Sequence, residues 1–572
     1  MFKIIFKVEG GEDVTVFAVG GENALELARS AGVPIDAPCS GNGTCGKCRV
    51  KVLDEKNASN FSCVNAIHDV WQLACESVIS GDITFLVPGI TASYINNISV
   101  EDYKKQGKQG DGSAVLYGLA IDIGTTTVSV LLVDLSTGDI LAKATTGNAQ
   151  IRYGADVINR IIEQQKPGGI KKLQDAIVKE TLILLIDELC AKTGVLKDKI
   201  TRLTVAANTT MNHLFLGIDA NSIRIEPYEP TFLEFEVYDP ASIGINVAPD
   251  AEMFLAPNIG SYVGGDITAG VMVAGVPSGW PMWKLPGMEM SHIIGQDDNG
   301  APIFEEFEIP PRTTLFIDLG TNGEIVLGTN EFMMACACSA GPAFEGGDIS
   351  CGMRATEGAI EKFSIHKSTM EPEFTVIGNV KPVGLCGSGL IDVVAELFRS
   401  GIINGKGKIT CASERICYDE YGTGRYIIVF ASDSASGIDI ALTESDIDNF
   451  IRAKGAIFSG IMSLLNPLGF TPADIDDVLI AGGIGSGINI KNAISIGMLP
   501  DLPEEKYSYI GNSSLDGAYA MLIVPEGDEV IEEIARGMTY IDLSTQPGYM
   551  DEFIAACFLP HTDETLFPSV RT

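Results

Sequence analysis

Positive charge and histidine are scarce in this sequence. Its 572 residues include 39 Lys and Arg against 75 Asp and Glu, and only 5 His, which share no metal-ligand spacing. The formal net charge of −36 gives a surface that repels phosphate backbones and anionic lipid headgroups. We therefore expect neither nucleic acid nor a membrane as a partner. A bound nucleotide is compatible with this charge, because backbone N–H groups and Mg²⁺ hold phosphates without basic side chains.

Long apolar runs are also missing. No uninterrupted stretch of about 18 apolar residues occurs, so the sequence predicts no membrane-spanning helix. Residues 1–10 alternate apolar and polar types, which is typical of a strand and not of a secretion signal. The 13 cysteines are an odd number, and without a secretion signal they favour metal binding or free thiols over disulfides. We expect a cytoplasmic protein.

Apolar material, by contrast, is plentiful. Hydrophobic residues make up 46% of the chain and charged residues 20%, which is enough for several buried cores and argues against disorder. The pattern of apolar strands and helices predicts an α/β multidomain protein. In chain order we expect a compact domain at 1–88, a polar flexible linker at 89–116, and two related lobes at 117–312 and 313–572, with an insertion near 280–312.

Four cysteines of the first domain have the spacing of an iron–sulfur site. Three of them lie on one glycine-rich loop, as Cys-x5-Cys-x2-Cys, and the fourth follows after 26 intervening residues. Four thiolates arranged in this way can hold two bridged irons. The candidate ligands are Cys39, Cys45, Cys48 and Cys75.

This cysteine pattern resembles the [2Fe–2S] ferredoxins of the bacterial and adrenal type. The predicted strands at 3–8, 13–19, 48–53 and 82–87 and the predicted helix at 24–31 fit the β-grasp fold of those proteins. A structural zinc site is the alternative, although such sites more often show two Cys-x2–4-Cys pairs. Cys63 is expected to be a free thiol, with replacement of Cys75 as a ligand left open.

A strand–turn–strand motif occurs twice in the remaining chain. Residues 119–131 and 315–327 are identical at seven of thirteen positions, and each copy contains Asp-x-Gly-Thr. The Asp at the strand end can hold Mg²⁺, while the Gly turn lets backbone N–H groups and the Thr hydroxyl approach phosphate. A Gly-Gly-x-Gly turn after a buried strand at 478–481 adds a third glycine-rich loop. A structural duplication that binds no nucleotide is the alternative.

These motifs resemble the ASKHA superfamily, which includes acetate and sugar kinases, Hsp70 and actin. The resemblance implies a two-lobe ATPase in which Asp122 and Asp318 act at Mg²⁺ and the phosphates. It assigns the remaining cofactor-binding residues to two phosphate loops and an adenosine turn, namely Gly124, Thr125 and Thr126, then Gly320, Thr321 and Asn322, then Gly482, Gly483 and Gly485. Asp266 could orient the attacking water, or cap the helix that follows it, or do both.

A ferredoxin linked to an ASKHA ATPase resembles the reductive activators of corrinoid proteins, which serve methyltransferase and O-demethylase systems of anaerobes. The resemblance implies ATP-dependent transfer of one electron from a [2Fe–2S] cluster to a Co(II) corrinoid, which restores methyl-accepting Co(I). It also implies a corrinoid protein as partner and an upstream electron donor. We hypothesise that the loop carrying Ser339 and Glu345 faces the partner and reports the nucleotide state; a turn that packs against the cleft is the alternative.

Other functions are less well supported. A small-molecule kinase with a fused redox-sensing ferredoxin, an electron-transfer module with a degenerate ATPase, and an activator of another radical or low-potential enzyme are the competing hypotheses. A second metal site among Cys336, Cys338, Cys351 and Cys386 is the alternative to buried core cysteines. His213 is expected to be packed or hydrogen-bonded.

Overall fold

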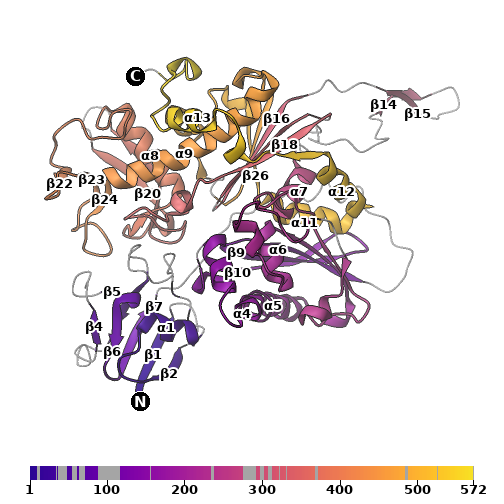
Figure 1. The fold of residues 1–572 in the computed structure, drawn as a ribbon, viewed down its shortest axis with the longest axis horizontal. Coiled ribbons are helices and arrows are strands. Elements are labelled where there is room, and N and C mark those ends of the chain that lie inside the picture. The colour runs from indigo at the N-terminus through magenta and orange to yellow at the C-terminus, as the bar shows by residue number, and fades with distance from the viewer. Residues whose placement is uncertain are drawn as a thin grey trace.

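The computed structural model describes most of the chain. The described residues are 1–8, 13–31, 33, 35, 48–53, 61–63, 71–87, 116–154, 156–233, 237–274, 291–296, 302–306, 312–320, 322–329, 331–366, 371–483, 487–524 and 526–570. The predicted site residues Cys39, Cys45, Thr321 and Gly485 lie outside them, as does the predicted linker as far as residue 115. Figure 1 shows the N-terminal strands in indigo beside two larger groups of elements, one purple to magenta and one orange to yellow.

The N-terminal strands form a five-stranded sheet in the order β2-β1-β7-β3-β5. β1 pairs antiparallel with β2 and parallel with β7. Alternation along β1 buries Ile4 and Phe6, which share a core with Leu25 and Ala28 of the helix that follows β2. This topology confirms the predicted β-grasp fold. The elements are β1 (Phe2–Val8), β2 (Val14–Ala18), α1 (Ala24–Ser30), β3 (Arg49–Val52), β5 (Trp71–Leu73) and β7 (Ile83–Val87), with a separate pair β4 (Phe61–Cys63) and β6 (Ser77–Ile79).

Two six-stranded sheets form the larger part of the protein. The first has the order β10-β9-β8-β11-β13-β12, and the second has the order β26-β25-β16-β17-β18-β27. Their strands are β8 (Tyr117–Ile123), β9 (Thr127–Asp134), β10 (Ile140–Gly147), β11 (Ile200–Ala207), β12 (Val237–Tyr238), β13 (Glu252–Leu255), β16 (Thr314–Leu319), β17 (Gly323–Gly328), β18 (Met333–Cys338), β25 (Asp477–Ala481), β26 (Tyr507–Gly511) and β27 (Met538–Tyr540).

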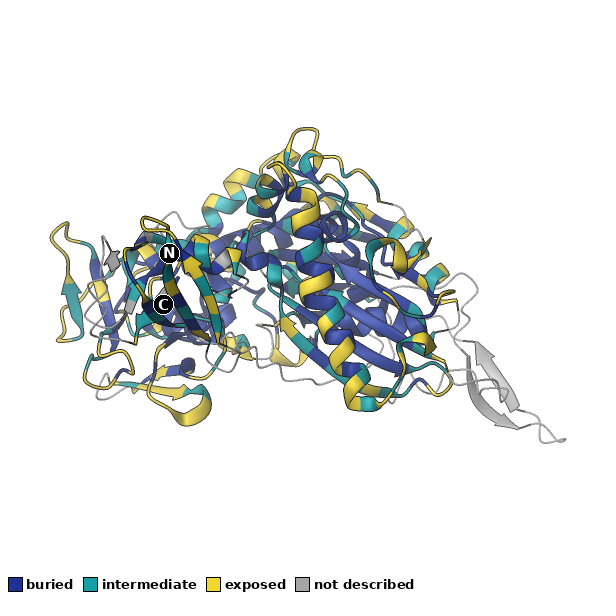
Figure 2. Ribbon diagram, turned by 90° about the horizontal axis from the view of Figure 1, so that it is seen from below, coloured by how far each residue is buried: buried dark blue, intermediate teal, exposed yellow. Residues whose placement is uncertain are grey.

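The two sheets repeat one arrangement. In each, the first strand pairs antiparallel with the second and parallel with the fourth, as β8 does with β9 and β11, and β16 does with β17 and β25. The repeated motif therefore forms the same hairpin, β8–β9 and β16–β17, in the middle of each sheet. This confirms the duplication predicted from the sequence. The nearly continuous apolar strands are buried, as the dark blue strands in Figure 2 show.

Helices cover the sheets. On the first sheet lie α3 (Val157–Gln164), α4 (Gly169–Ile177), α5 (Ile183–Thr193) and α6 (Thr209–Leu216), which share a core with β8, β9 and β11. The second lobe contains α8 (Gly387–Arg399), α9 (Glu444–Leu465), α10 (Ile490–Ser495) and α13 (Tyr549–Ala556). It also contains two small sheets, built from β19 (Ala359–Ile365), β20 (Pro372–Val376) and β21 (Gly384–Leu385), and from β22 (Ile416–Tyr418), β23 (Gly424–Val429) and β24 (Ile440–Thr443).

Two helices join the lobes through a third core. α7 (Gly265–Val273) and α11 (Ser513–Ile523), with α12 (Gly527–Gly537), pack with apolar residues of both sheets. At Gly517 the backbones of α11 and α7 are so close that an added Cβ would lie 2.1 Å from the carbonyl oxygen of Ala269. Thr204 of β11 donates a hydrogen bond to the carbonyl of Ala518, at 2.6 Å. The two sheets are thus held together by a shared apolar layer.

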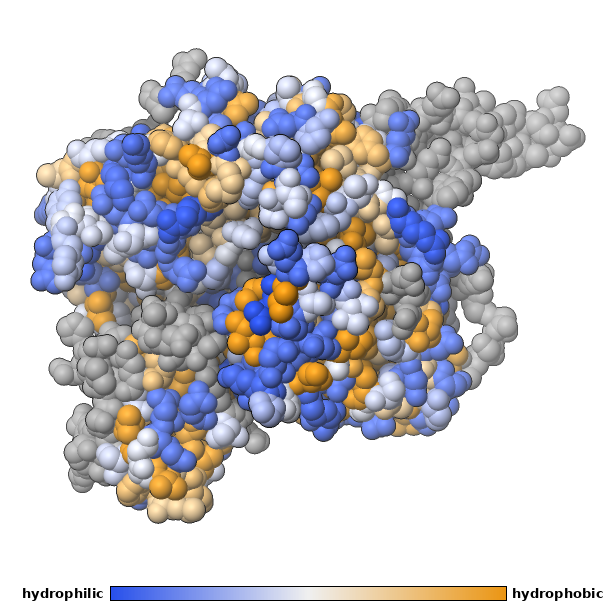
Figure 3. All heavy atoms as spheres, viewed as in Figure 1, coloured by the Kyte–Doolittle hydropathy of each residue, from blue (hydrophilic) through white to orange (hydrophobic). Residues whose placement is uncertain are grey.

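The segment predicted as an aperiodic insertion contains regular structure. Within it, β14 (Ser291–Gln296) and β15 (Pro302–Glu306) form an antiparallel hairpin, which the sequence pattern did not indicate. None of the described helices is long and apolar enough to cross a membrane. On the face shown in Figure 3, hydrophilic and hydrophobic residues are interspersed over both lobes.

Candidate nucleotide cleft and iron–sulfur site

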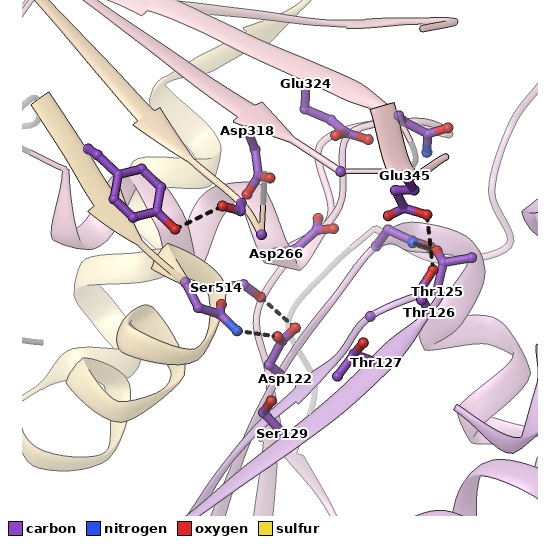
Figure 4. Close-up of a pocket in the computed structure, with 18 of the residues that line it drawn as sticks. Asp122, Thr125, Thr126, Thr127, Ser129, Asp266, Asp318, Glu324, Glu345 and Ser514 are labelled. Carbon is purple, nitrogen blue, oxygen red and sulfur yellow. Dashed lines mark hydrogen bonds between the residues drawn. The ribbon is translucent and has the colours of Figure 1, made fainter. Parts of the chain in front are cut away.

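The two hairpin turns face each other across a cavity of about 150 Å³ (Figure 4). Both lobes and the glycine turn after β25 contribute to its lining. The predicted residues that it brings together are Asp122, Gly124, Thr125, Thr126, Asp266, Asp318, Gly320, Asn322, Gly482, Gly483 and Glu345. The described residues of the predicted nucleotide site therefore line one and the same cavity.

The first hairpin turn needs its glycine. The amide of Gly124 donates to the carbonyl of Thr127 at 2.9 Å, which closes the turn. An added Cβ at Gly124 would lie 2.7 Å from that carbonyl oxygen, so a larger residue would open the turn. The side-chain amide of Asn208 donates a hydrogen bond to the hydroxyl of Thr125 at 3.1 Å and fixes one side chain of the loop. The turn is thus held in one compact shape.

The second hairpin turn is closed in the same way and lies against the late glycine turn. Gly320 donates its N–H to the carbonyl of Asn322 at 3.0 Å. Because β25 lies beside β16, Gly482 follows directly next to this loop. Gly482 has φ +91°, and its added Cβ would lie 2.4 Å from the carbonyl oxygen of Leu319 and 2.7 Å from a carboxylate oxygen of Asp318. Only glycine fits this position.

The carboxyl groups in the cavity have raised pKa values. Burial, followed by the charge of Asp122, raises the pKa of Asp318 to about 7. The pKa of Asp266 lies well above its usual range because of burial and then the charges of Asp318 and Asp122. Burial also raises the pKa of Asp122, although hydrogen bonds from Asn512 (2.8 Å) and Ser514 (3.0 Å) oppose the shift. The cavity therefore disfavours the ionised forms of these carboxyls, and a bound divalent cation would favour them.

Two further charged residues, Glu324 and Lys143, line the cavity and were not predicted, and Asp516 lies close enough to interact with Lys143 and Asp122. Glu324 of β17 is the register partner of Asp318, and burial raises its pKa well above the usual range. Burial also raises the pKa of Asp516 to about 7 and lowers the pKa of Lys143. The charges of these two side chains interact with each other. Glu324 could have been predicted, because the repeated hairpin places it opposite Asp318. Lys143 and Asp516 come from other elements, and no motif near them in the sequence indicates that they reach the site.

The carboxylates do not by themselves form a metal site. Among the described residues, no three Asp, Glu, His or Cys side chains are grouped closely enough to hold a metal ion. This donor set fits a cation held between carboxylates and the phosphate oxygens and waters of a bound nucleotide, as Mg²⁺ usually is.

A second cavity of about 600 Å³ adjoins the first. Both are lined by Thr126, Thr127, Glu345, Gly483 and Tyr509. The larger cavity continues between the second sheet and the small sheet of β19–β21, past the start of α8 at Gly387–Ser388. The larger cavity has room for a nucleoside next to the phosphate loops.

The predicted partner-facing loop divides into two parts. Ser339, directly after β18, is exposed and lines neither cavity. Glu345 lines both cavities, and the hydroxyl of Thr126 donates to its carboxylate at 3.3 Å across the two lobes. The loop therefore does pack against the cleft, and it connects the first phosphate loop to an exposed segment.

Asp266 is placed in the cavity and is not a helix cap. The N-cap of α7 is Gly264, and Asp266 lies in the first turn, where it accepts a hydrogen bond from the N–H of Ile267 at 3.0 Å. The capping hypothesis for Asp266 was therefore wrong. Its carboxyl is available to the cavity that it lines.

The two described cysteines of the predicted cluster lie side by side. The N–H of Cys75 donates to the sulfur of Cys48 at 3.4 Å, and the carbonyl of Cys48 accepts from the N–H of Ala74 at 2.7 Å. Cys48 is buried, and within the described residues neither cysteine forms a disulfide bond. Two adjacent thiols next to backbone N–H groups fit half of a four-thiolate iron site. Cys63 lies in β4, where it pairs with Ser77.

The other singled-out cysteines and His213 lie in the core. Cys336 and Cys338 are buried in β18, where burial raises the pKa of both thiols. His213 is fully buried; its Nδ1 lies 2.7 Å from the carbonyl of Thr209, and its Nε2 accepts the N–H of Thr231 at 3.1 Å. The prediction of a packed, hydrogen-bonded histidine is confirmed.

Three family matches cover most of the chain. Residues 7–80 match the 2Fe–2S iron–sulfur cluster binding domain. Residues 117–278 match the RACo middle region, and residues 312–571 match the C-terminal domain of RACo, the ASKHA domain. The matches follow the order of the N-terminal sheet and the two larger sheets.

Curated proteins and a solved structure resemble the chain over most of its length. The corrinoid activation enzyme RamQ of Eubacterium limosum is 31% identical over 448 residues, which are 77% of this chain and 70% of that protein. The [Co(II) methylated amine-specific corrinoid protein] reductase of Methanosarcina barkeri is 24% identical over 445 residues, 74% of this chain and 73% of that protein. A solved reductive activator for corrinoid, iron-sulfur protein is 36% identical, covers 100% of both chains and has a TM-score of 0.66.

Proposed function

We infer that this chain, which belongs to the family of reductive activators of corrinoid proteins, is an ATP-dependent activator that returns the cobalt of a partner corrinoid protein from Co(II) to Co(I). One observation carries this inference. A ferredoxin fold with two cysteines in contact and a duplicated phosphate cleft occur in one chain that is related to such activators over most of its length. The corrinoid protein of a methyltransferase or O-demethylase system is the partner that we propose.

The electron-transfer function belongs to the N-terminal domain. We assign Cys39, Cys45, Cys48 and Cys75 as the ligands of a [2Fe–2S] cluster, which when bound supplies electrons one at a time. One electron reduces Co(II) to Co(I), and an upstream electron donor replaces it. We place the protein in the cytoplasm, where thiols stay reduced.

The nucleotide function belongs to the cleft. The two phosphate loops would bind the phosphates of ATP, with Thr321 completing the second loop and Gly485 completing the adenosine turn. Asp122 and Asp318 would hold Mg²⁺ against the phosphates, and Asp266 would orient the attacking water. The raised pKa values of these carboxyls, which follow from burial and mutual repulsion, support a role in binding a cation.

ATP is needed because the electron moves to an acceptor of lower reduction potential, which costs free energy. Each 100 mV of unfavourable potential requires about 2.3 kcal/mol for one electron. Preferential binding of the Co(II) partner selects the inactive form but cannot supply this free energy, because a binder shifts an equilibrium only toward the state that it binds more tightly. The free energy must therefore come from ATP. ATP hydrolysis then separates the complex after transfer, so that the activator can act again.

We propose that the loop from Ser339 to Glu345 transmits the nucleotide state to the partner. Glu345 contacts Thr126 of the first phosphate loop at 3.3 Å, and Ser339 is exposed at the other end of the same loop. A phosphate that binds at Thr126 would repel the Glu345 carboxylate, because both are negatively charged. The resulting movement would reach the segment at Ser339.

Anaerobic absorbance spectroscopy tests this function. The reconstituted chain is mixed with a purified Co(II) corrinoid protein, a reductant, Mg²⁺ and ATP, and formation of Co(I) is followed. We expect reduction only when both the cluster and ATP are present, and a higher affinity for the Co(II) partner than for the Co(I) partner. Equal rates without adenine nucleotide would contradict the proposal, as would equal affinities for both cobalt states.

A further inference from the structure

A fully buried arginine lies behind the first phosphate loop. Arg160 of α3 has no exposed surface. Its guanidinium donates to the carbonyl of Thr125, to the carbonyl of Gly154 at 2.8 Å and to the side-chain oxygen of Gln150 at 3.1 Å, and lies 3.3 Å from the sulfur of Met211. One side chain thus links the loop to three other parts of the first lobe.

Arg160 completes a set of donors behind three successive loop carbonyls. The carbonyl of Gly124 accepts from the side-chain amide of Asn148 at 2.9 Å, and the carbonyl of Thr126 accepts from the backbone N–H of Asn148 at 2.8 Å. The carbonyl between them, that of Thr125, accepts from Arg160. The first phosphate loop is therefore held by its carbonyl oxygens.

Holding the carbonyls also sets the direction of the amides. In a trans peptide the N–H group points to the side opposite the C=O of the same unit. The three fixed carbonyls therefore turn the N–H groups of residues 125–127 away from the donors behind the loop. Thr125, Thr126 and Thr127 line the cavity, so these amides are directed to the place where a phosphate would lie.

The charge of Arg160 is not cancelled by a direct ion pair. Its hydrogen-bond acceptors are two carbonyls and a side-chain amide oxygen, and in the described part of the chain no carboxylate lies within ion-pair distance of it. A buried guanidinium without such a partner is costly to keep, and it favours any anion that arrives nearby. Burial lowers the pKa of Arg160 to about 9, so the group stays charged at neutral pH.

We propose that Arg160 is a positioning residue for the first phosphate loop. Its guanidinium fixes the Thr125 carbonyl so that the loop amides face the β- and γ-phosphates, and its charge adds attraction for those phosphates through the loop. This inference rests on the proposed binding of ATP in the cleft and names the residue that prepares the cleft for it.

Arg152 is the matched control. It lies in the preceding segment, η3 (Ala149–Arg152), and is 8% exposed, but its guanidinium pairs with Glu180 instead of the phosphate loop. Replacing Arg152 or Arg160 by Met removes a largely buried guanidinium in both cases. Only Arg160→Met removes the donor to the Thr125 carbonyl.

The test compares ATP and AMP as competitors of a fluorescent ADP analogue, on the full chain with Mg²⁺. AMP lacks the β- and γ-phosphates, so it reports the rest of the site. We expect Arg160→Met to weaken ATP binding about tenfold or more while AMP binding changes less than twofold. Arg152→Met should bind both nucleotides within twofold of wild type. Arg160→Lys, which keeps the charge with fewer donors, should fall between wild type and Arg160→Met.

The outcomes separate the possibilities. Unchanged ATP affinity in Arg160→Met overturns the inference, and so does an equal loss of ATP and AMP affinity, which would mean a purely structural role. If Arg160→Met does not fold, Arg160→Lys decides: a selective loss of ATP affinity supports the inference, and wild-type affinity overturns it. Failure of the wild-type chain to bind ATP would instead overturn the proposed function itself.

Discussion

At the scale of single residues, the cleft concentrates acids that the fold alone does not neutralise. Asp122, Asp266 and Asp318 come from three different elements, and Glu324 and Asp516 add two more carboxyls near them. Burial favours their neutral forms, and each ionised neighbour raises the pKa of the others. A site of this kind loses stability when its acids ionise without a cation, and it recovers that stability when Mg²⁺ and nucleotide bind.

The Asp318→Asn variant should reveal this effect through pH. A carboxyl whose pKa rises on folding to about 7 stabilises the fold fully below its unfolded pKa and loses this contribution as pH rises through 7. In chelator, wild type and variant should therefore melt at similar temperatures only near pH 4, close to the unfolded pKa. Between pH 4 and 7 the variant should become the more stable of the two, and above pH 7 the difference should stay constant. Calorimetry from pH 4 to 8.5 measures the difference, and a difference that does not change between pH 4 and 7 would contradict the prediction.

Residues with a local signal were predictable, and residues that reach the site from elsewhere were not. Asp122 and Asp318 could be found because each precedes Gly-Thr at the end of an apolar strand. Lys143 and Arg160 could not, because strand β10 and helix α3 bring them to the cleft only after the lobe has folded. Their positions depend on tertiary packing, which no short motif records.

At the scale of elements, α9 begins at a buried junction with the loop that carries Glu345. Thr443 and Asp446 form a capping box at its N-terminus. The Asp446 carboxylate also accepts hydrogen bonds from the N–H (2.7 Å) and hydroxyl (2.6 Å) of Ser350, shortly after Glu345 in the chain. The start of the helix thus fixes one end of the segment that contacts the first phosphate loop.

Replacing Asp446 by Ala should therefore destabilise the second lobe. The change leaves four donors without their acceptor in a site where Asp446 is only 4% exposed. We expect a decrease of about 3 kcal/mol in the free energy of unfolding, measured by denaturant titration. Asp474→Ala removes a similar box at an exposed turn and should cause a smaller loss. Equal losses in the two variants would show that the link to Ser350 contributes nothing.

The hairpins were the predictable elements and the small sheets were not. Long apolar strands around Asp-x-Gly-Thr predict β8–β9 and β16–β17 because a buried strand is apolar on both faces. The sheets β19–β21 and β22–β24 have mixed burial and short strands, so their pattern differs little from that of loops. The strands β14 and β15 are also short.

At the scale of the whole molecule, two functions share one chain but have separate cores. The N-terminal sheet has its own apolar cluster, and the two lobes have three others. The order of the domains could be predicted because each carries its own motif. The way in which α7 and α11 join the lobes could not, since their sequences are apolar all round and do not show which sheet they cover.

Separate cores predict separate losses of function. Cys48→Ser should abolish cluster absorbance and cobalt reduction, because it removes one of the four proposed ligands, while ATP affinity stays within twofold of wild type. Cys190→Ser, at a half-buried thiol of α5, should leave both properties unchanged. Anaerobic absorbance and nucleotide titration measure the two properties. A parallel loss of ATP affinity in Cys48→Ser would contradict the separation.

The close approach of α7 and α11 has a mechanical consequence. At Gly517 the helices meet backbone to backbone, with no side chain of α11 wedged into α7 at that point. Such a crossing can act as a hinge between the two lobes, since rotation there does not require interlocked side chains to disengage. The two six-stranded sheets lie on either side of this hinge, and the proposed phosphate loops lie where the two sheets face each other. We expect rotation about this hinge to let the cleft admit or release a ligand, while the apolar layer between the two sheets stays closed to water.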